Sequence, residues 1–399
     1  MEALPLDGLR VLDLTQMLSG PLAGTRLGDL GADVIKVEKP DSGEFNRTHG
    51  FQDVTFHGEM TTFLAVNRNK RSLPLNLKES RGVEIFKLLV RSHDVLIHNF
   101  RPGVLERLGL GFEDLSEINP RLIYCAISGY GSFGRLASRP GQDLILQGYS
   151  GSMFAVGAEN DPPSPGALWA ADAMTGYQAV IGILSALHER SISGNGALIE
   201  VDMYGAVLDA QLQELLTFLN TGTKPTRSET PSAHTSIPAP YGVYRTADGW
   251  MTLAMSPLPA LGKLLGNEWL QTLTDYNDGH IKKDEIYGEI KDAFLGHGTA
   301  HWVEQADQFG VWAGPVYDYE DLSKESHLVD SELITTQPGP QGAIKTIGIP
   351  IRINGKRPKI RKSAPALGAD TRSILREIGL DDGEISLLIS SGVTKESAK

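Results

Sequence analysis

Asp172 is the only charged residue between Gly166 and Gly176 (GALWAADAMTG), where small residues precede a helical pattern. A carboxylate in this place can cap the helix, because Asp side chains accept hydrogen bonds from the free N–H groups of a first turn. It can also be a buried ion-pair partner or a nucleophile, since the helix dipole favours the ionised form and the neighbouring alanines leave room for a substrate. Capping and catalysis are compatible, so the alternatives stay open.

A second motif, GYGSFG at residues 129–134, matches the pattern G-x-G-x-x-G and follows an apolar strand pattern. A dinucleotide-binding turn needs a helix directly after the motif and an acidic residue about 20 positions further on to hold a ribose. The next residues, RLASRPG, do not open a helix readily, and the acidic residue is missing. The motif indicates either a plain glycine-rich turn or a loop that lets a ligand approach the backbone.

The connection at residues 15–21 (TQMLSGP) can present backbone N–H groups to a phosphate or an acyl group, or it can be a simple turn. Basic residues follow near the ends of the next predicted strands, where a doubly wound sheet places its ligands. Each of them alone is more typical of a solvated surface. They are Lys36, Lys39, Arg68, Lys70, Arg71, Arg101 and Arg107.

Other catalytic templates are missing from the sequence. It contains no H-E-x-x-H, Walker A or G-x-S-x-G motif, and His188-Glu189 lacks a second histidine at ligand spacing. The single cysteine, Cys125, excludes an intramolecular disulfide and a cysteine-based zinc site. We therefore expect no metal site and a reducing compartment.

The overall composition narrows the class of partner. The chain has 399 residues, of which 41% are hydrophobic and 22% charged, and a formal net charge of -12. An acidic protein does not suit nucleic acid or an anionic membrane, and no segment approaches a membrane-spanning length. We predict a cytoplasmic protein with neither partner.

Strand and helix patterns alternate through the first half of the chain, which predicts an α/β fold with a doubly wound, mostly parallel sheet. The apolar stripe of residues 173–190 predicts a largely buried helix. The expected strands are 10–14, 33–38, 72–77, 94–98, 121–128 and 197–203, and the expected helices include 21–30, 82–90 and 204–219.

The composition changes at residues 221–240, which are rich in Thr, Pro, Ser and Gly and predict a linker or a mobile loop. Residues 241–255 alternate around Asp248-Gly249, a hairpin signal that opens a second domain. The tail at 370–389 predicts paired short helices.

Taken together, several segments resemble the family III CoA-transferases, the group that contains formyl-CoA transferase and carnitine CoA-transferase. The resemblance covers nearly the whole chain and depends on the order and spacing of these segments more than on any one of them. They are LDGLRVLDLTQMLSGPLAGTRLGDLGADVIKVEKPDSGE, NRNKRSLPLNLK, NFRPGVLERLGLGFEDL, NPRLIYCAISGYG, AADAMTGYQAVIGILSALHERSISGNG and PYGVYRTADGW.

The resemblance implies a Rossmann-like large CoA-binding domain made of residues 1–196 and 330–399. It implies a linker helix at 197–222 and a smaller α+β domain at 223–329. It further implies an interlocked homodimer, in which two chains are threaded through each other.

The resemblance also gives Asp172 the role of the catalytic aspartate. Its carboxylate would attack the thioester of an acyl-CoA, forming a mixed anhydride and then an aspartyl-CoA thioester, from which a small carboxylic acid accepts CoA. CoA is then a substrate, and no cofactor is needed. Gly131 would lie close to the thioester. The residues expected to contact CoA are Ser19, Lys39, Leu75, Lys78, Asn99, Phe100, Arg101 and Arg107.

Acyl-CoA racemases share this fold and resemble the chain in its N-terminal half. They pair the aspartate with a histidine, and the corresponding stretch RPGQDLIL has Gln142, which lacks an accessible base. Gln142 is retained as a residue of the acyl-CoA site. The alternatives to CoA transfer are racemisation and a non-catalytic acyl-CoA-binding protein.

The sequence departs from the family pattern in ways that affect the CoA contacts and the acceptor. Glu44 replaces a usual aspartate, His98 a common glutamate and Arg135 a common proline. The glycine run that shields the intermediate in formyl-CoA transferase is missing, and we look for a substitute lid within 221–240. Dicarboxylates such as succinate or oxalate are common acceptors in the family.

Overall fold

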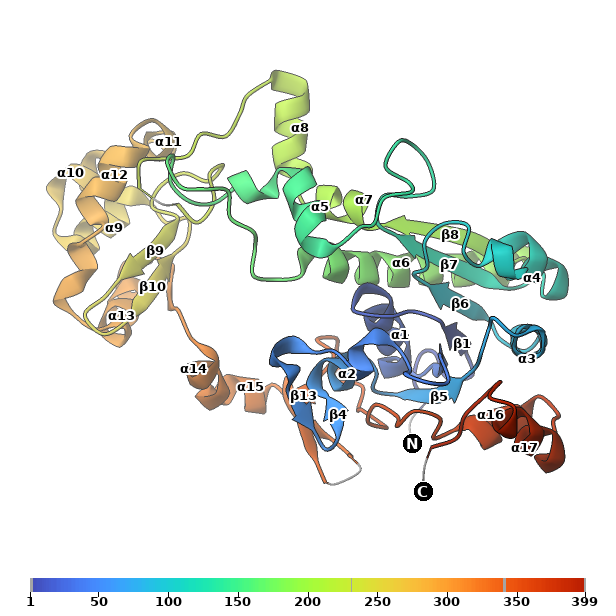
Figure 1. Cartoon of the computed structure of the whole chain (residues 1–399). Helices are drawn as coiled ribbons and strands as arrows, with labels where there is room; N and C mark the ends of the chain where they lie inside the picture. Colours follow the sequence, from blue (N-terminus) through green and yellow to red (C-terminus); the bar gives the residue numbers. More distant parts are fainter. Residues whose placement is uncertain (1–2, 231, 340–341, 398–399) are drawn as a thin grey trace. The chain divides into compact units, whose positions relative to one another are not determined.

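The computed structural model describes residues 3–230, 232–339 and 342–397. Its chain forms two compact units (Figure 1). The larger unit contains the chain up to Leu146, Trp169–Val207 and the chain from Ser326 onward. The smaller unit contains Gln147–Leu168 and Leu208–Glu325.

A six-stranded sheet in the order β5-β2-β1-β6-β7-β8 forms the centre of the larger unit, and every neighbouring pair is parallel. The order runs from β1 to β2 and β5 on one side and from β6 to β8 on the other. The switch point therefore lies between β1 and β6, where such sheets place ligands. The strands are β1 (Arg10–Asp13), β2 (Asp33–Glu38), β5 (Lys70–Pro74), β6 (Val95–His98), β7 (Ile123–Ser128) and β8 (Ala197–Asp202).

Helices cover both faces of this sheet, because alternate strand residues are apolar on both sides. Val11 belongs to the core shared with α1 (Ser19–Asp29) and α6 (Ala170–Ser193). Leu12 belongs to the core on the other face. That core is shared with α3 (Ser80–Val90), α4 (Phe112–Ile118), α16 (Thr371–Glu377) and α17 (Asp382–Ser390). The doubly wound fold and the paired C-terminal helices are confirmed.

The prediction that 173–190 is a largely buried helix is wrong in one respect. Helix α6 packs on the sheet through small residues such as Ala179, while Ile181 on its other side is 56% exposed. Gly176 allows the close packing of α6 on α1, because a Cβ there would lie 2.8 Å from the carbonyl oxygen of Ser19. Ile183 is buried against the sheet, whereas Met174, Tyr177, Ile181 and Leu184 are exposed on the outer face.

The smaller unit has a three-stranded antiparallel sheet in the order β11-β10-β9. The hairpin predicted around Asp248-Gly249 is confirmed, with Arg245 paired to Trp250. The strands are β9 (Gly242–Arg245), β10 (Trp250–Leu253) and β11 (Ala313–Pro315). The helices include α9 (Leu258–Leu265), α10 (Glu268–Thr272), α11 (Asp278–Ile281), α12 (Lys283–Ile290), α13 (Thr299–Phe309) and α14 (Tyr319–Lys324).

The remaining elements are short. Residues 197–222, expected as a linker helix, contain strand β8 followed by α7 (Met203–Asp209) and α8 (Leu212–Thr221). The predicted domain boundaries themselves stay a prediction. The other elements are β3 (Thr55–Phe56), β4 (Glu59–Met60), α2 (Thr61–Val66), α5 (Asp143–Ser150), α15 (Ser326–Asp330), β12 (Ile334–Gln337) and β13 (Ile344–Ile347). Among the described residues, no helix has both the length and the apolar character needed to cross a bilayer.

The contact at Gly176 yields a stability prediction. Gly176→Ala places a methyl group against the Ser19 carbonyl oxygen, so we expect a loss of about 1–3 kcal/mol in the free energy of unfolding. Gly288→Ala is the matched control, because Gly288 is an exposed helical glycine with open space around it. It should stabilise the protein by roughly 0.5–1 kcal/mol. Chemical denaturation measures both, and equal effects of the two variants would contradict the close packing of α1 on α6.

Candidate active site

A cavity of about 340 Å³ lies at the switch point of the larger unit. Its walls come from the loops that follow β1, β6 and β7 and from the N-terminal turn of α6. The parallel strands bring these loops to one edge of the sheet. The lining includes Gln16, Met17, Ser19, Asn99, Phe100, Arg101, Ser128, Gly129, Arg139, Gln142 and Asp172.

Asp172 is the third residue of α6, and the N-cap position belongs to Trp169, so the interpretation of Asp172 as the N-cap is wrong. Its carboxylate accepts hydrogen bonds from the hydroxyl and the backbone N–H of Ser19. Ser19 is the first residue of α1. The N–H groups in the first turn of a helix have no partner within that helix, so the N–H of Ser19 is free to bind Asp172. The carboxylate therefore lies at the positive ends of two helices.

A second carboxylate, Asp143, lies beside Asp172 and is buried at the first residue of α5. Its Oδ1 accepts a hydrogen bond of 3.2 Å from the backbone N–H of Asp172. Burial raises the pKa of Asp172 to about 6, and the charge of Asp143 adds to the increase, while the bonds from Ser19 lower it. Asp172 is thus more basic than an ordinary aspartate and still ionised at neutral pH.

This pair gives the site its chemical capability. A partly desolvated carboxylate of raised basicity is a better nucleophile than one in water, and it is held at the wall of a cavity. Asp143 was missed by the sequence reasoning. The available signal was its position directly after Gln142 in the stretch RPGQDLIL.

The structure brings some of the predicted CoA contacts to the cavity and leaves others outside it. Ser19, Asn99, Phe100, Arg101 and Gln142 line the cavity together with Asp172. The side chains of Lys39, Lys78 and Arg107 are exposed and lie outside its lining, as does Gly131. Leu75 is buried in the sheet core. The roles of all these residues in CoA binding stay a prediction.

Several of the basic residues near the strand ends serve the fold instead of a ligand. Lys70 is fully buried and lies 2.8 Å from Asp13, and Arg68 lies 2.7 Å from Asp29. Lys36 is buried beside Glu44, and Arg71 pairs with Asp33. The interpretation as a solvated charge is wrong for Lys36, Arg68 and Lys70, because all three side chains are buried and paired with carboxylates.

The glycine motif at residues 129–134 begins a loop whose two ends, Gly129 and Gly141, lie in contact. A Cβ on Gly129 would lie 2.6 Å from the Cα of Gly141, so the two backbones touch. The next helix, α5, begins only at Asp143, which does not match a dinucleotide-binding turn. Gly129 lines the cavity, which agrees with a loop that a ligand can approach.

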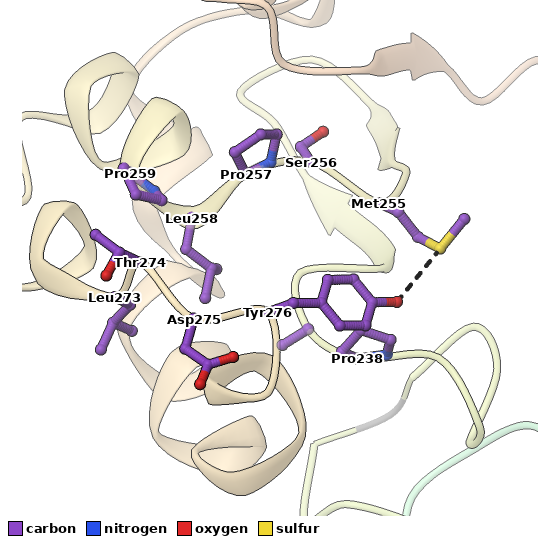
Figure 2. A pocket seen from close by; sticks show the side chains of 11 residues that line it. Pro238, Met255, Ser256, Pro257, Leu258, Pro259, Leu273, Thr274, Asp275 and Tyr276 are labelled. Atoms are coloured by element: carbon purple, nitrogen blue, oxygen red, sulfur yellow. Dashed lines mark hydrogen bonds between the residues drawn. The ribbon is translucent and has the colours of Figure 1, made fainter.

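A second cavity, of about 310 Å³, lies in the smaller unit (Figure 2). Its walls are mainly apolar and include Pro238, Pro257, Leu258 and Pro259, and the Tyr276 hydroxyl lies 3.9 Å from the sulfur of Met255. Its described lining has one carboxylate, that of Asp275, and no basic side chain. Among the residues that the structure describes, no group of three His, Cys, Asp or Glu side chains could hold a metal ion.

Comparison with known proteins shows what the whole chain is similar to. The family model described as CoA-transferase family III matches residues 6–371. The chain is 35% identical to succinyl-CoA:glutarate CoA-transferase of Mus musculus, over 98% of this chain and 91% of the relative. It is 33% identical to acetyl-CoA:oxalate CoA-transferase of Acetobacter aceti, over 95% and 97%. A crystal structure of a CAIB/BAIF family protein from Brucella suis matches with a TM-score of 0.84 and 31% identity, over 94% of this chain and all of that one.

The contacts of Asp172 predict opposite effects of two substitutions on its pKa. Asp143→Asn removes a nearby negative charge and should lower the pKa of Asp172, while Ser19→Ala removes a hydrogen bond to the carboxylate and should raise it. A carboxyl carbon NMR titration of aspartate-labelled protein measures both. The signal is assigned by its loss in Asp172→Asn, and shifts of the same sign in both variants would contradict the described site.

Proposed function

The chain belongs to CoA-transferase family III, and we propose that it moves CoA from an acyl-CoA to a free carboxylic acid through covalent intermediates on Asp172. The observation that carries the mechanism is the geometry of this carboxylate. It lies at the wall of the cavity, accepts two hydrogen bonds from Ser19 and has a pKa of about 6.

The first half-reaction takes two steps. An oxygen of Asp172 attacks the thioester carbon, a C–O bond forms, the C–S bond breaks, and CoA leaves as the thiolate with an acyl-aspartyl anhydride remaining. The thiolate then attacks the Asp172 carbonyl carbon. The donor acid leaves as its carboxylate, and an aspartyl-CoA thioester remains.

The second half-reaction reverses these steps with the acceptor. The acceptor carboxylate attacks the aspartyl carbonyl carbon and releases the thiolate, and the thiolate attacks the acceptor carbonyl of the new anhydride. The products are acceptor-CoA and the free Asp172 carboxylate. No proton or electron is gained or lost, so this chain of steps needs no cofactor.

The substrate class follows from the relatives and the charge at the cavity. The relatives named above act with succinyl-CoA and glutarate or with acetyl-CoA and oxalate. Arg101 and Arg139 line the cavity, and guanidinium groups pair well with carboxylates. We propose a short acyl-CoA as the donor and a small dicarboxylate as the acceptor, in a cytoplasmic setting.

The homodimer is part of the same proposal. In the larger unit, α6 exposes Tyr177, Ile181 and Leu184 on the face away from the sheet. In the smaller unit, α8 exposes Leu212, Leu216 and Leu219. Apolar patches of this kind are typical of surfaces that another chain covers.

Substitution of the nucleophile tests the mechanism. We expect Asp172→Ala and Asp172→Asn to lower the rate of CoA transfer from succinyl-CoA by about 10³-fold or more, because Asp172 is the one carboxylate in the described lining of the cavity. The affinity for CoA, measured by calorimetry, should change little. Asp41→Asn, at an exposed aspartate outside the cavity, is the control.

Trapping identifies the intermediate in the same experiment. After incubation with succinyl-CoA and hydroxylamine, mass spectrometry should find a hydroxamate on Asp172 alone. Substantial activity in either variant would refute the covalent mechanism. Exchange of the α-proton with deuterium in place of transfer would indicate racemisation, and binding without turnover would indicate an acyl-CoA-binding protein.

Light scattering after size-exclusion chromatography tests the assembly. We expect a particle of twice the 43.2 kDa of one chain, because the exposed apolar faces are then covered. The mass should persist on dilution if the chains are interlocked. A mass of one chain at micromolar concentration would refute the homodimer.

A further inference from the structure

The loop between β1 and α1 has an unusual backbone conformation next to the active site. Met17 has a φ of 69°, in the left-handed region that residues with a side chain rarely adopt. Such conformations persist only where the surroundings hold them in place. The contacts of this loop therefore show what fixes it.

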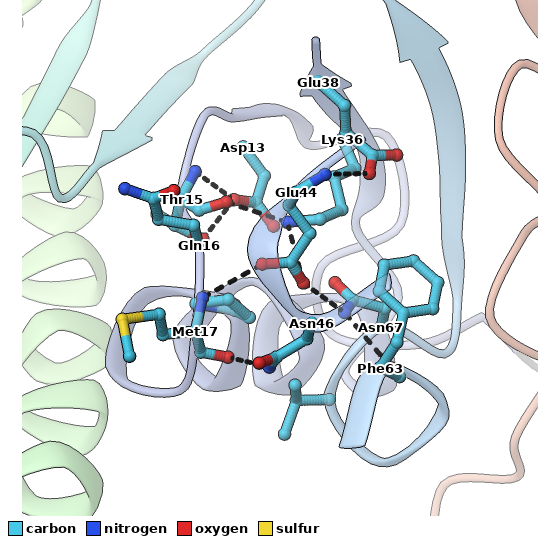
Figure 3. Close-up of polar contacts among 12 residues, drawn as sticks. Asp13, Thr15, Gln16, Met17, Lys36, Glu38, Glu44, Asn46, Phe63 and Asn67 are labelled. Atoms are coloured by element: carbon cyan, nitrogen blue, oxygen red, sulfur yellow. Dashed lines mark hydrogen bonds and ion pairs between the residues drawn. The ribbon is translucent and has the colours of Figure 1, made fainter. Parts of the chain in front are cut away.

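Side chains from other elements bind the backbone of this loop at successive residues, and Figure 3 shows those that bind Met17. The amide of Asn99 accepts from the N–H of Gln16 at 3.0 Å and donates to its carbonyl oxygen at 2.7 Å. Glu44 accepts from the N–H of Met17 at 3.0 Å, and Asn46 donates to its carbonyl oxygen at 2.6 Å. Both polar groups of the strained residue are therefore bonded to one segment, residues 44–46.

Glu44 is itself held rigidly. Its side chain is buried, and its second carboxylate oxygen accepts a hydrogen bond of 3.2 Å from Asn67. The ammonium group of Lys36 lies 3.9 Å from the same oxygen and donates to the carbonyl oxygen of Thr15 at 2.9 Å. The backbone N–H of Glu44 donates to Glu38 at 3.1 Å. The carboxylate is thus a fixed anchor for the loop.

The loop in turn places Ser19, two residues after Met17. Gly20, the residue after Ser19, packs against Thr15. The carbonyl oxygen of Ser19 packs against Gly176 of α6. The hydroxyl and N–H of Ser19 donate to Asp172. A change in the backbone at Met17 would therefore move the two donors that orient the nucleophile.

We propose that Glu44, together with Asn46, is a positioning residue that holds Met17 in its strained conformation and so aligns Ser19 with Asp172. This inference rests on the proposed role of Asp172. Neither residue touches the cavity, so each acts through the loop.

Three alanine variants separate positioning from a general effect on the fold. Glu44→Ala removes the partner of the Met17 N–H, and Asn46→Ala removes the partner of its carbonyl oxygen. Glu59→Ala is the control, because Glu59 belongs to the same cluster through Arg47 at 3.3 Å and makes no described bond to the loop. The readouts are kcat, KM for succinyl-CoA, the pH dependence of kcat, and hydrogen exchange of a peptide covering residues 14–22.

We expect kcat to fall by about 10-fold to 100-fold in Glu44→Ala and Asn46→Ala, with KM nearly unchanged, because misalignment affects the reacting atoms more than binding. The acid limb of the pH profile should move to higher pH. Lost Ser19 bonds raise the pKa of Asp172, and Asp172 must be ionised to attack. The other charged groups near Asp172 are unchanged in these variants: Asp143 beside it, and Arg101 and Arg139 in the cavity lining.

Hydrogen exchange of the 14–22 peptide should speed up in both variants and stay unchanged in Glu59→Ala. Glu44→Gln keeps an oxygen that can accept from Met17, so it should recover most of the lost kcat. If Glu44→Ala does not fold, Asn46→Ala decides the question, because Asn46 is partly exposed and lies outside the ion pairs.

Faster exchange with an unchanged kcat and acid limb would overturn the inference, as would equal effects in Glu59→Ala. This failure is distinct from failure of the proposed function. The exchange measurement does not depend on catalysis, and the role of Asp172 is tested by its own variants.

Discussion

The larger unit depends on a buried ammonium group, that of Lys70. It lies 2.8 Å from the carboxylate of Asp13 and within hydrogen-bond distance of Asn67 and of the carbonyl oxygens of Pro21 and Val66. Burial lowers its pKa to about 8, which still leaves it charged at neutral pH beside Asp13. A buried charge is tolerated only when fully partnered, so this group fixes the relative positions of β1, β5 and the N-terminal turn of α1. The switch point lies beside β1, so the position of β1 also sets the position of the switch point.

The candidate active site lies here because α1 and α6 meet closely at this point. Gly24 lets α1 approach Asp13 and Lys70, and Gly176 lets α6 approach Ser19. Both contacts leave no room for a methyl group, so the two helix N-termini converge. Backbone packing therefore fixes the positions of Asp172 and of its donor Ser19. A site held in this way is more rigid than one built from long side chains.

The sequence was sufficient for the order of the elements, because that order depends on local patterns. Local pattern alone did not settle Asp172, whose catalytic role was implied by the family resemblance and stays a prediction. Strands that alternate with helices predict the parallel sheet, and the sheet order predicts where a ligand binds. The sequence could not predict that Lys36, Lys70 and Arg68 point inward, since a lysine in a strand has the same local signal whether or not a carboxylate faces it. Asp143 was missed for the same reason: its partner is distant in the chain. The exposed face of α6 was misjudged because an apolar stripe does not tell which side the sheet takes.

The basicity of Asp172 shows which of its competing interactions is largest. A helix N-terminus typically stabilises an anion by about 0.3–1 kcal/mol, and Asp172 lies at two of them. Raising its pKa from 3.8 to about 6 corresponds to about 3 kcal/mol against the ionised form. Burial and the Asp143 charge therefore outweigh the Ser19 bonds. The site keeps the carboxylate ionised at neutral pH and more basic than a fully stabilised aspartate, and the proposed attack on a thioester needs both properties.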